Sequence, residues 1–299
     1  MRPGRRWSSA ATLLAAAGLV ACGGGSPGAA GSVGSSTPTA SFPGASGTVL
    51  PTPTSDASPP SSSSPRPSSP RPSSPRPSVS PTPAPSGLPV GLLGRVVPRV
   101  PTSSHVVALT FDAGANADGV SSILATLSAK HVPASFFLTG RFVTLYPGPS
   151  RQLAAAGRVG NHTVTHPHLP DLAAAQARAE VTEARATILV TTGEDPLPFF
   201  RFPYGSSTPA TVRLVNGLGY VAVGWTVDSL GWKGTSGSVT VDSVISRVVG
   251  ARTPGAIVLM HVGSNPTDGS TLDADALPQI IDGLRAQGYS FVTLDALLG

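Results

Sequence analysis

The stretch that decides the fold reads Val106-Val107-Ala108-Leu109-Thr110-Phe111 and is followed at once by Asp112. An unbroken apolar and β-branched run of this length predicts a buried strand. The next segment, residues 120–129, carries apolar residues at helical intervals, and Asp118 precedes it as a candidate N-cap. A buried strand followed by an amphipathic helix is the repeating unit of parallel α/β sheets.

The same alternation continues to the end of the chain. We predict further strands at 134–138, 159, 199–202, 220–224, 256–260 and 291–294, and helices at 150–156, 172–190, 208–218, 239–249 and 274–287. About seven such units predict an α/β fold with a parallel sheet, closed into a (β/α) barrel, while a doubly wound open sheet is the competing arrangement. No Gly-x-Gly-x-x-Gly follows the first strand, so the sequence predicts no dinucleotide site.

The N-terminus has the features of an export signal. Three arginines lie within residues 1–7, an apolar stretch covers residues 10–20, and Leu19-Val20-Ala21-Cys22 resembles a bacterial lipobox. The apolar stretch is too short to span a membrane stably. We therefore predict a lipoprotein-type signal peptide at residues 1–21 and a lipid on Cys22, with an ordinary cleavage site as the alternative. Cys22 is the only cysteine, so no internal disulfide can form.

Residues 22–100 differ in composition from the rest of the chain. Ser, Pro, Gly, Thr and Ala dominate, and Ser-Pro-Arg-Pro-Ser recurs from Ser64, Ser69 and Ser74. Such a segment buries too little apolar surface to offset its ordering entropy, so we predict a disordered linker. In a polyproline II conformation at ~3.1 Å per residue it reaches on the order of 200 Å. Residues 101–299 are left as one globular domain, which we expect to be monomeric.

The positive net charge belongs to the linker. Of 20 Lys and Arg residues and 15 Asp and Glu residues, eight arginines and Asp56 lie within residues 1–100. The remaining twelve basic and fourteen acidic residues give residues 101–299 a formal charge of −2. The sequence therefore predicts no nucleic-acid interface.

Two histidines stand four apart in Asn161-His162-Thr163-Val164-Thr165-His166, just after the predicted strand at 159. On a helical turn, residues i and i+4 share one face, so both imidazoles can reach one ion. His162 and His166 are therefore candidate ligands of Zn²⁺ or a similar metal, although such pairs also arise by chance in surface loops.

The other candidates also follow predicted strands. Asp112 is a candidate general base and His261 a candidate general acid, with a capping carboxylate and a core histidine as the structural alternatives. Arg201 is placed to orient a base or bind a carboxylate, and Asp228 to pair with it. Three aromatic residues, Tyr204, Trp225 and Trp232, suit a stacking wall for a sugar, with core packing as the alternative for Trp225.

Five motifs occur in order along residues 104–299. They are Thr110-Phe111-Asp112-Ala113-Gly114, His162-Thr163-Val164-Thr165-His166, Arg201-Phe202-Pro203-Tyr204, Asp228-Ser229-Leu230-Gly231-Trp232 and Leu259-Met260-His261. Together they resemble the motifs of polysaccharide deacetylases with a NodB homology domain, carbohydrate esterase family 4. The resemblance implies a distorted (β/α) barrel that removes acetyl groups from sugar polymers with a divalent metal, usually Zn²⁺ or Co²⁺.

The resemblance also implies a role for each residue. Asp112 would be the base, His261 the acid, and His162 and His166 the metal ligands. Arg201 would orient Asp112, and Asp228 would tune the site together with Arg201. Tyr204, Trp232 and Leu259 would shape the pocket for the acetyl group and the sugar. The implied partner is an acetylated glycan such as peptidoglycan or chitin oligomers, reached by a secreted enzyme that its lipid anchors to the outer face of the cell membrane.

Two positions depart from the family's pattern. Ala113 stands where the first motif usually has an acidic metal ligand, and Gly231 stands where the fourth motif usually has a second Asp. Asn116 or Asp118 is a candidate replacement for the missing ligand, with helix capping as the alternative for Asp118. A glycan-binding module with a weakened metal site is therefore the alternative to a deacetylase.

Overall fold

The computed structural model describes residues 87–299, so the predicted signal peptide, Cys22 and most of the predicted linker lie outside the described residues. The strands are β1 Val96–Val97, β2 Val106–Ala113, β3 Ser135–Leu138, β4 Arg158–Asn161, β5 Phe199–Phe200, β6 Val221–Val223, β7 Val227–Asp228, β8 Ala256–His261 and β9 Ser290–Phe291. The α-helices are α1 Val120–Ala129, α2 Gly140–Leu145, α3 Pro147–Ala156, α4 Ala174–Thr192, α5 Pro209–Gly217, α6 Val241–Gly250 and α7 Leu272–Ala286. None of these helices is both long enough and apolar enough to cross a bilayer.

The sheet is parallel throughout and curves around the molecule. Its order is β1-β6-β5-β4-β3-β2-β8-β7, and β9 pairs with β2. The two ends of this sheet approach each other, because Thr226 Oγ1 donates to the carbonyl of Pro98 at 2.8 Å and Arg99 forms an antiparallel bridge to Ala256. The fold is therefore the distorted (β/α) barrel that the alternation predicts, rather than an open doubly wound sheet.

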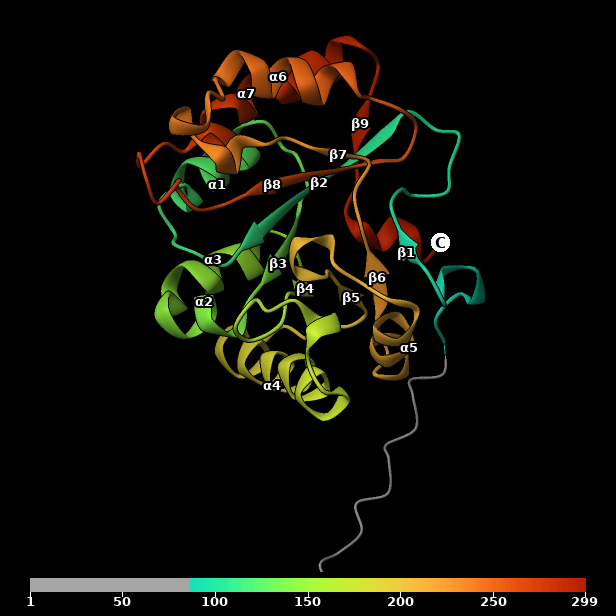
Figure 1. The fold of residues 1–299 in the computed structure, drawn as a ribbon. Coiled ribbons are helices and arrows are strands. Elements are labelled where there is room, and N and C mark those ends of the chain that lie inside the picture. The colour runs from blue at the N-terminus through green and yellow to red at the C-terminus, as the bar shows by residue number, and fades with distance from the viewer. Residues whose placement is uncertain (1–86) are drawn as a thin grey trace, which may run out of the picture. The chain divides into compact units, whose positions relative to one another are not determined.

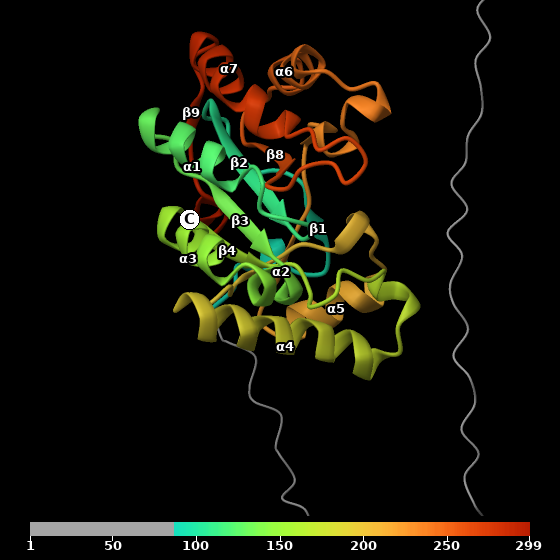
Figure 2. The same cartoon turned by 90° about the vertical axis from the view of Figure 1, so that its left-hand side faces the viewer.

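Helices cover the sheet on its outer side. Figures 1 and 2 show α6 and α7 together at one end of the domain and α4 and α5 together at the other, with β2, β3 and β8 between them. The largest apolar cluster joins β2, β3 and β8 to α1, α3, α6 and α7. At its centre the rings of Phe111 and Phe136 stack at 5.6 Å. Because all strands run in one direction, their carboxyl ends form one rim, which positions the site.

The long elements lie close to their predicted ranges. Helix α1 matches 120–129, and α5 and α6 begin after Thr208 and Thr240, whose hydroxyls accept backbone N–H bonds from the first helical turn. Asp118 does not cap α1: its N-cap is Gly119, which provides no side-chain bond. The prediction of a cap at Asp118 was wrong.

The predicted start of the globular domain at residue 101 is too late. Residues 96–97 form β1, which pairs with β6, and Leu92, Val97 and Val100 are buried in an apolar cluster with Phe137 and Phe199. The last residues of the predicted linker are therefore part of the barrel.

Candidate active site

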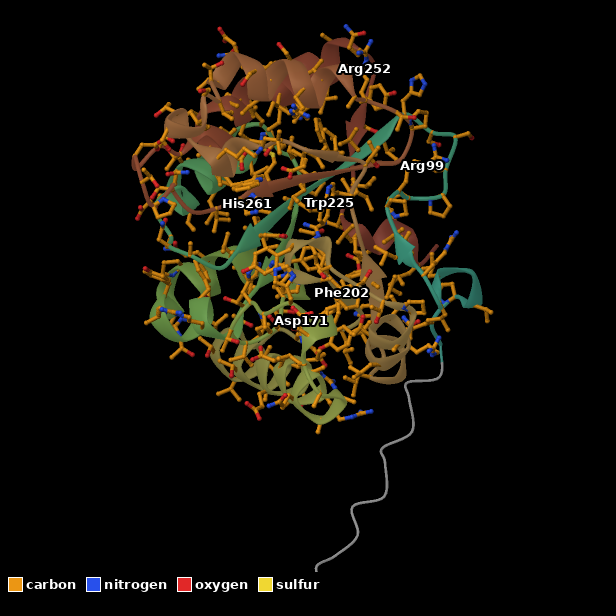
Figure 3. All side chains as sticks on the ribbon, in the orientation of Figure 1. Arg99, Asp171, Phe202, Trp225, Arg252 and His261 are labelled. Atoms are coloured by element: carbon orange, nitrogen blue, oxygen red, sulfur yellow. The ribbon has the colours of Figure 1, made fainter. Side chains whose placement is uncertain are left out.

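A cleft of about 740 Å³ opens at the carboxyl ends of the strands. The predicted site residues that line it are Asp112, His162, His166, Tyr204, Asp228, Trp232, Leu259 and His261. The ninth, Arg201, lies directly beneath Asp112 and is fully buried. The structure thus brings together residues that are up to 149 positions apart in the chain, from Asp112 to His261. Figure 3 shows His261 and Trp225 on neighbouring parts of this rim.

Asp112 is held by a buried network. Arg201 Nη1 donates to Asp112 Oδ1 at 2.7 Å, and Nη2 donates to Thr110 Oγ1 at 2.9 Å and to the carbonyl of Gly224 at 3.2 Å. The guanidinium also lies 4.1 Å from the centre of the Phe137 ring. Burial alone raises the pKa of Asp112, but Arg201, His162 and His261 outweigh it and hold the pKa below its ordinary value. Asp112 is therefore a carboxylate whose remaining oxygen faces the histidines.

The two motif histidines converge, but not on a helical turn. The segment after β4 is a loop in which Thr163 and His166 both have positive φ angles, 69° and 64°. This loop places His162 Nε2 and His166 Nε2 3.1 Å apart, and His162 Nε2 lies 3.4 Å from Asp112 Oδ2. The two histidines thus lie together in one cleft, while the helical geometry predicted for them was wrong.

The strained loop is fixed by side chains that sequence reasoning missed. Asn161 Oδ1 accepts the N–H of Thr163, and its amide group donates to the carbonyl of Val181 and to Tyr220 Oη. Glu180 on α4 accepts both backbone N–H groups of Val164 and Thr165. Positive φ at non-glycine residues costs free energy, and bonds of this kind compensate for it. Asn161 stands inside the quoted Asn161–His166 stretch, so the sequence offered a way to find it. Glu180 lies 14 residues after His166 within a predicted helix, and no local pattern marks it as a residue of the site.

The donor set of the pair suits a divalent metal. His162 Nδ1 donates to the carbonyl of Arg201 at 2.9 Å, which leaves Nε2 without a proton and facing His166. Two Zn–N bonds of ~2.0–2.1 Å at a tetrahedral angle place their nitrogens ~3.3 Å apart, close to the 3.1 Å between the Nε2 atoms. Burial lowers the pKa of His162, and burial followed by the neighbouring His162 lowers the pKa of His166 to about 4. Both imidazoles are therefore neutral, the form that binds metal.

In the part of the chain that the structure describes, no third protein ligand completes this pair. Within residues 87–299, no three His, Cys, Asp or Glu side chains form a metal-ligand cluster. Asn116 is occupied elsewhere, since its amide group bonds the backbone N–H and C=O of Ser264. Asp118 Oδ2 accepts from Ser264 Oγ, and neither residue lines the cleft. Neither Asn116 nor Asp118 replaces the acid missing at Ala113.

The other predicted residues form the walls of the cleft. Tyr204 stacks on His168 at 4.1 Å and meets the edge of His166 at 4.6 Å, and it stays 61% exposed. Trp232 is 46% exposed, and its Nε1 donates to Asp228 Oδ2 at 3.4 Å. Among the described residues Asp228 makes no direct hydrogen bond or ion pair with Arg201, and the two interact only through their charges, since Asp228 acts to raise the pKa of Arg201 against the effect of burial. Two exposed aromatic rings thus flank the polar centre.

His261 lies opposite Asp112 on the neighbouring strand, since the two are partners in the β2–β8 register. Burial lowers the pKa of His261, but the Asp273 carboxylate, followed by Asp112 and Asp228, reverses this and raises the pKa above its ordinary value. The site therefore places a carboxylate that can accept a proton, Asp112, opposite a histidine that keeps its proton to higher pH than a free imidazole does.

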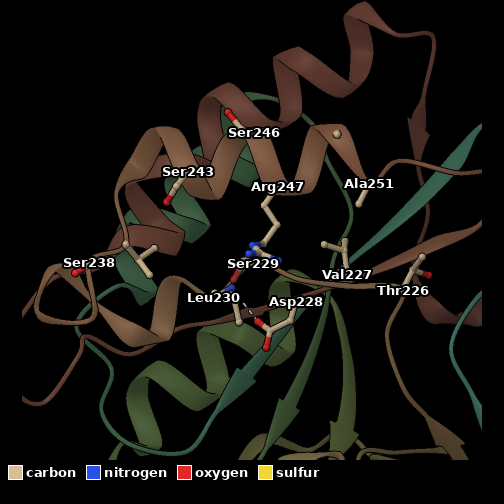
Figure 4. A pocket seen from close by; sticks show the side chains of 12 residues that line it. Thr226, Val227, Asp228, Ser229, Leu230, Ser238, Ser243, Ser246, Arg247 and Ala251 are labelled. Atoms are coloured by element: carbon tan, nitrogen blue, oxygen red, sulfur yellow. Dashed lines mark hydrogen bonds between the residues drawn. The ribbon is translucent and has the colours of Figure 1, made fainter.

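A second cavity, of about 830 Å³, lies between β7 and α6 (Figure 4). Arg247 and the serines of α6 line it, and Asp228 borders both cavities. Its lining residues include no histidine and no carboxylate apart from Asp228. The chemistry described above is therefore confined to the first cleft.

Comparisons with known proteins agree on one family. The family model for polysaccharide deacetylases matches residues 99–223. A peptidoglycan-N-acetylglucosamine deacetylase of Bacillus cereus is 32% identical over 66% of this chain and 70% of its own length. A chitooligosaccharide deacetylase of Sinorhizobium fredii is 32% identical over 65% of this chain and 93% of its own.

The solved structures that resemble this chain include both an inactive and an active protein. A carbohydrate esterase family 4 pseudoenzyme from Bacillus anthracis superposes with a TM-score of 0.62 at 28% identity, covering 69% of each chain. A mutant of the same protein with restored enzymatic activity superposes with a TM-score of 0.62 at 29% identity, covering 69% of this chain and 72% of that one. This fold therefore occurs both with and without catalysis.

Proposed function

Because the chain belongs to the polysaccharide deacetylase family, we propose that it hydrolyses the acetyl groups of an acetylated glycan, with N-acetyl sugars of peptidoglycan or chitin oligomers as the substrate class. The observation that carries the proposal is the joint presence of Asp112, His162, His166 and His261 in one cleft, with Arg201 buried beneath Asp112 and bonded to it. A binding module needs the aromatic walls but has no use for a buried Arg–Asp pair aimed at two histidines.

Each residue takes a role that follows from its surroundings. His162 and His166 would hold the metal, Zn²⁺ or Co²⁺, which when bound would supply Lewis-acid polarisation of the acetyl carbonyl and lower the pKa of water. Asp112, kept ionised by Arg201, accepts the proton of the attacking water. His261 gives its proton to the sugar nitrogen as the C–N bond breaks, so that acetate and a free amine leave the site. Tyr204, Trp232 and Leu259 contact the sugar and the acetyl group.

The alternative is a glycan-binding module on the same fold. Ala113 favours it, because a pair of histidines without a protein carboxylate binds metal less tightly than a complete set. The related pseudoenzyme favours it as well. The two functions differ in metal content and in acetate release, and one experiment measures both.

The full chain is purified, its metal content is measured, and acetate release is assayed on peptidoglycan, chitin oligomers and acetylated xylan. We expect one divalent metal per chain and acetate from at least one glycan. His162→Gln should lose metal and activity together, whereas His168→Gln, which changes a neighbouring exposed histidine, should keep its metal. Asp112→Asn should keep metal and lose activity by about 10²–10⁴-fold. Absence of both metal and acetate release in the wild-type protein would establish the binding module instead.

A further inference from the structure

One buried carboxylate near the cleft has no role so far. Asp273 lies in the first turn of α7 and is only 3% exposed. Its Oδ2 accepts the backbone N–H of His261 at 2.8 Å and lies 3.7 Å from His261 Nδ1. Asp273 Oδ1 and His261 Nδ1 are both buried without a hydrogen-bond partner. Leaving Nδ1 unpaired is costly, and because Oδ2 lies only slightly beyond hydrogen-bond distance, a small rotation of the ring or the carboxylate would pair Nδ1 with it.

The ring of His261 has two different environments. Nδ1 is buried against Asp273, while the side chain as a whole is 31% exposed and lines the cleft. The edge that carries Nε2 is therefore the one available to a substrate. A carboxylate behind Nδ1 fixes both the tautomer and the orientation of an imidazole that exchanges protons through Nε2.

Gly231 explains why this carboxylate can reach the histidine. A Cβ atom at Gly231 would collide with Asp273 Oδ1 and would lie 2.6 Å from Cγ and 3.0 Å from Oδ2. Gly231 is not among the residues with positive φ, so its backbone accepts any L-residue. The Asp273 carboxylate thus occupies the space that a side chain at position 231 would fill, at the position where the fourth motif departs from the family's pattern.

We infer that Asp273 is the positioning residue of His261, supplied from α7 in place of an acid at position 231. The Asp273 side chain accepts the Nδ1–H bond, and the proton that His261 delivers to the sugar nitrogen leaves from Nε2. This inference rests on the proposed function for the step it serves. The contact between Asp273 and His261 does not depend on the proposed function and can be tested without it.

A purely structural role for Asp273 makes different predictions. An acidic residue in the first turn stabilises a helix through its dipole, and Asp275 occupies the same turn of α7. Asp275 is exposed and meets only Thr271 Oγ1, at 3.3 Å. Asp275→Asn is therefore the matched control, because it removes the same charge from the same turn without touching His261.

The first measurement is ¹⁵N NMR of the His261 ring in the full chain, which requires no turnover. With Asp273 in place, neutral His261 should carry its proton on Nδ1. In Asp273→Asn, whose amide group can donate to Nδ1, the proton should move to Nε2, whereas Asp275→Asn should match the wild type. A wild-type ring protonated on Nε2 would overturn the inference. A wild-type ring protonated on Nδ1 in a chain that releases no acetate would support the contact and refute the proposed function alone.

The second measurement relocates the carboxylate. Asp273→Asn should lower kcat by about 10–100-fold with KM nearly unchanged, the size seen when the partner of a functional histidine is lost. The double variant Gly231→Asp/Asp273→Gly, which moves the acid from α7 to position 231, should recover most of that loss. Unchanged kcat in Asp273→Asn, or a loss that the double variant does not recover although it folds, would show that Asp273 acts only on the structure.

Discussion

At the scale of single residues, the site depends on one buried ion pair. Arg201 and Asp112 are both almost completely buried, and Arg201 reaches Asp112, Thr110 and a backbone carbonyl at once. Burying charges is costly, and removing one partner of such a pair typically destabilises a protein by ~3–5 kcal/mol. The pair offsets the effect of burial, which alone would raise the pKa of Asp112, and so favours the ionised carboxylate in the cleft.

The neutral histidines make the stability of the metal-free protein depend on pH. Folded His166 has a pKa of about 4, whereas an unfolded histidine titrates near ~6.5. Between these values the unfolded chain binds more protons than the folded one, so the free energy of unfolding falls as the pH drops from about 6.5 to 4. We expect urea unfolding of the metal-free protein to show this loss between pH 7 and 4.5.

His166→Gln should lose less stability over that interval than the wild type, because the titrating group is gone. His168→Gln leaves the pair intact and should follow the wild type. Equal losses in all three proteins would mean that other groups cause the pH dependence.

The residues that the sequence could and could not predict differ in a simple way. Asp112, His162, Arg201 and His261 each follow a strand that its own apolar run reveals, so their place on one rim followed from topology. Asp273 and Glu180 act from helices that pack on the rim, and no local pattern reports which residue of a helix meets a loop far away in the chain. For Asp228 the strand pattern predicted its position on the rim but not its hydrogen-bond partners, Leu230 and Trp232, because partners depend on the direction in which a side chain points.

At the scale of elements, apolar patterning found the long strands and helices and missed β1, β7 and α2. Strands β1 and β7 have two residues each, too few for any periodicity to appear. Strands β5 and β9 are equally short, but β5 falls within the longer predicted range 199–202 and β9 overlaps the predicted range 291–294. Helix α2 follows β3 immediately and shares its apolar character, so the boundary between them is set by Thr139, whose side chain accepts the N–H of Phe142. A boundary between a strand and a helix of this kind is set by the N-cap residue rather than by a change in apolar composition.

Strand β1 should be essential for folding although it lies in the predicted linker. A chain that begins at Gly87 should unfold cooperatively with the stability of the full chain. One that begins at Thr102 lacks the buried side chains of Leu92, Val97 and Val100, each worth about 1.5–3 kcal/mol, and should lose on the order of 5 kcal/mol in urea unfolding.

Single variants separate the strand from the rest of the segment. Val97→Ala should be destabilising, since Val97 is 1% exposed, and Val90→Ala should be neutral, since Val90 is 85% exposed. Full stability of the chain from Thr102 would show that the barrel does not need β1.

At the scale of the whole molecule, charge is divided between two parts with different tasks. Residues 87–299 hold 14 basic and 14 acidic residues and carry no formal net charge, and the excess of arginine lies in residues 1–86. A domain without net positive charge and with an aromatic-walled cleft suits a glycan rather than a nucleic acid. We propose that the Pro-rich segment carries this domain away from a membrane anchor, since an extended chain of that length reaches on the order of 200 Å.

The anchor itself can be tested at one residue. Cys22 is the only cysteine of the chain, so any thiol-linked lipid must be attached there. A single acyl chain binds a membrane only marginally. A lipidated N-terminal cysteine carries more than one chain and can therefore hold the protein at the membrane stably. In Cys22→Ser we expect the protein to leave the membrane fraction and to take up no labelled fatty acid. Acetate release by the purified protein should stay unchanged, because the residues that line the cleft all fall between Asp112 and Pro266. Membrane association that persists in Cys22→Ser would show that something other than a lipid on this residue holds the protein there.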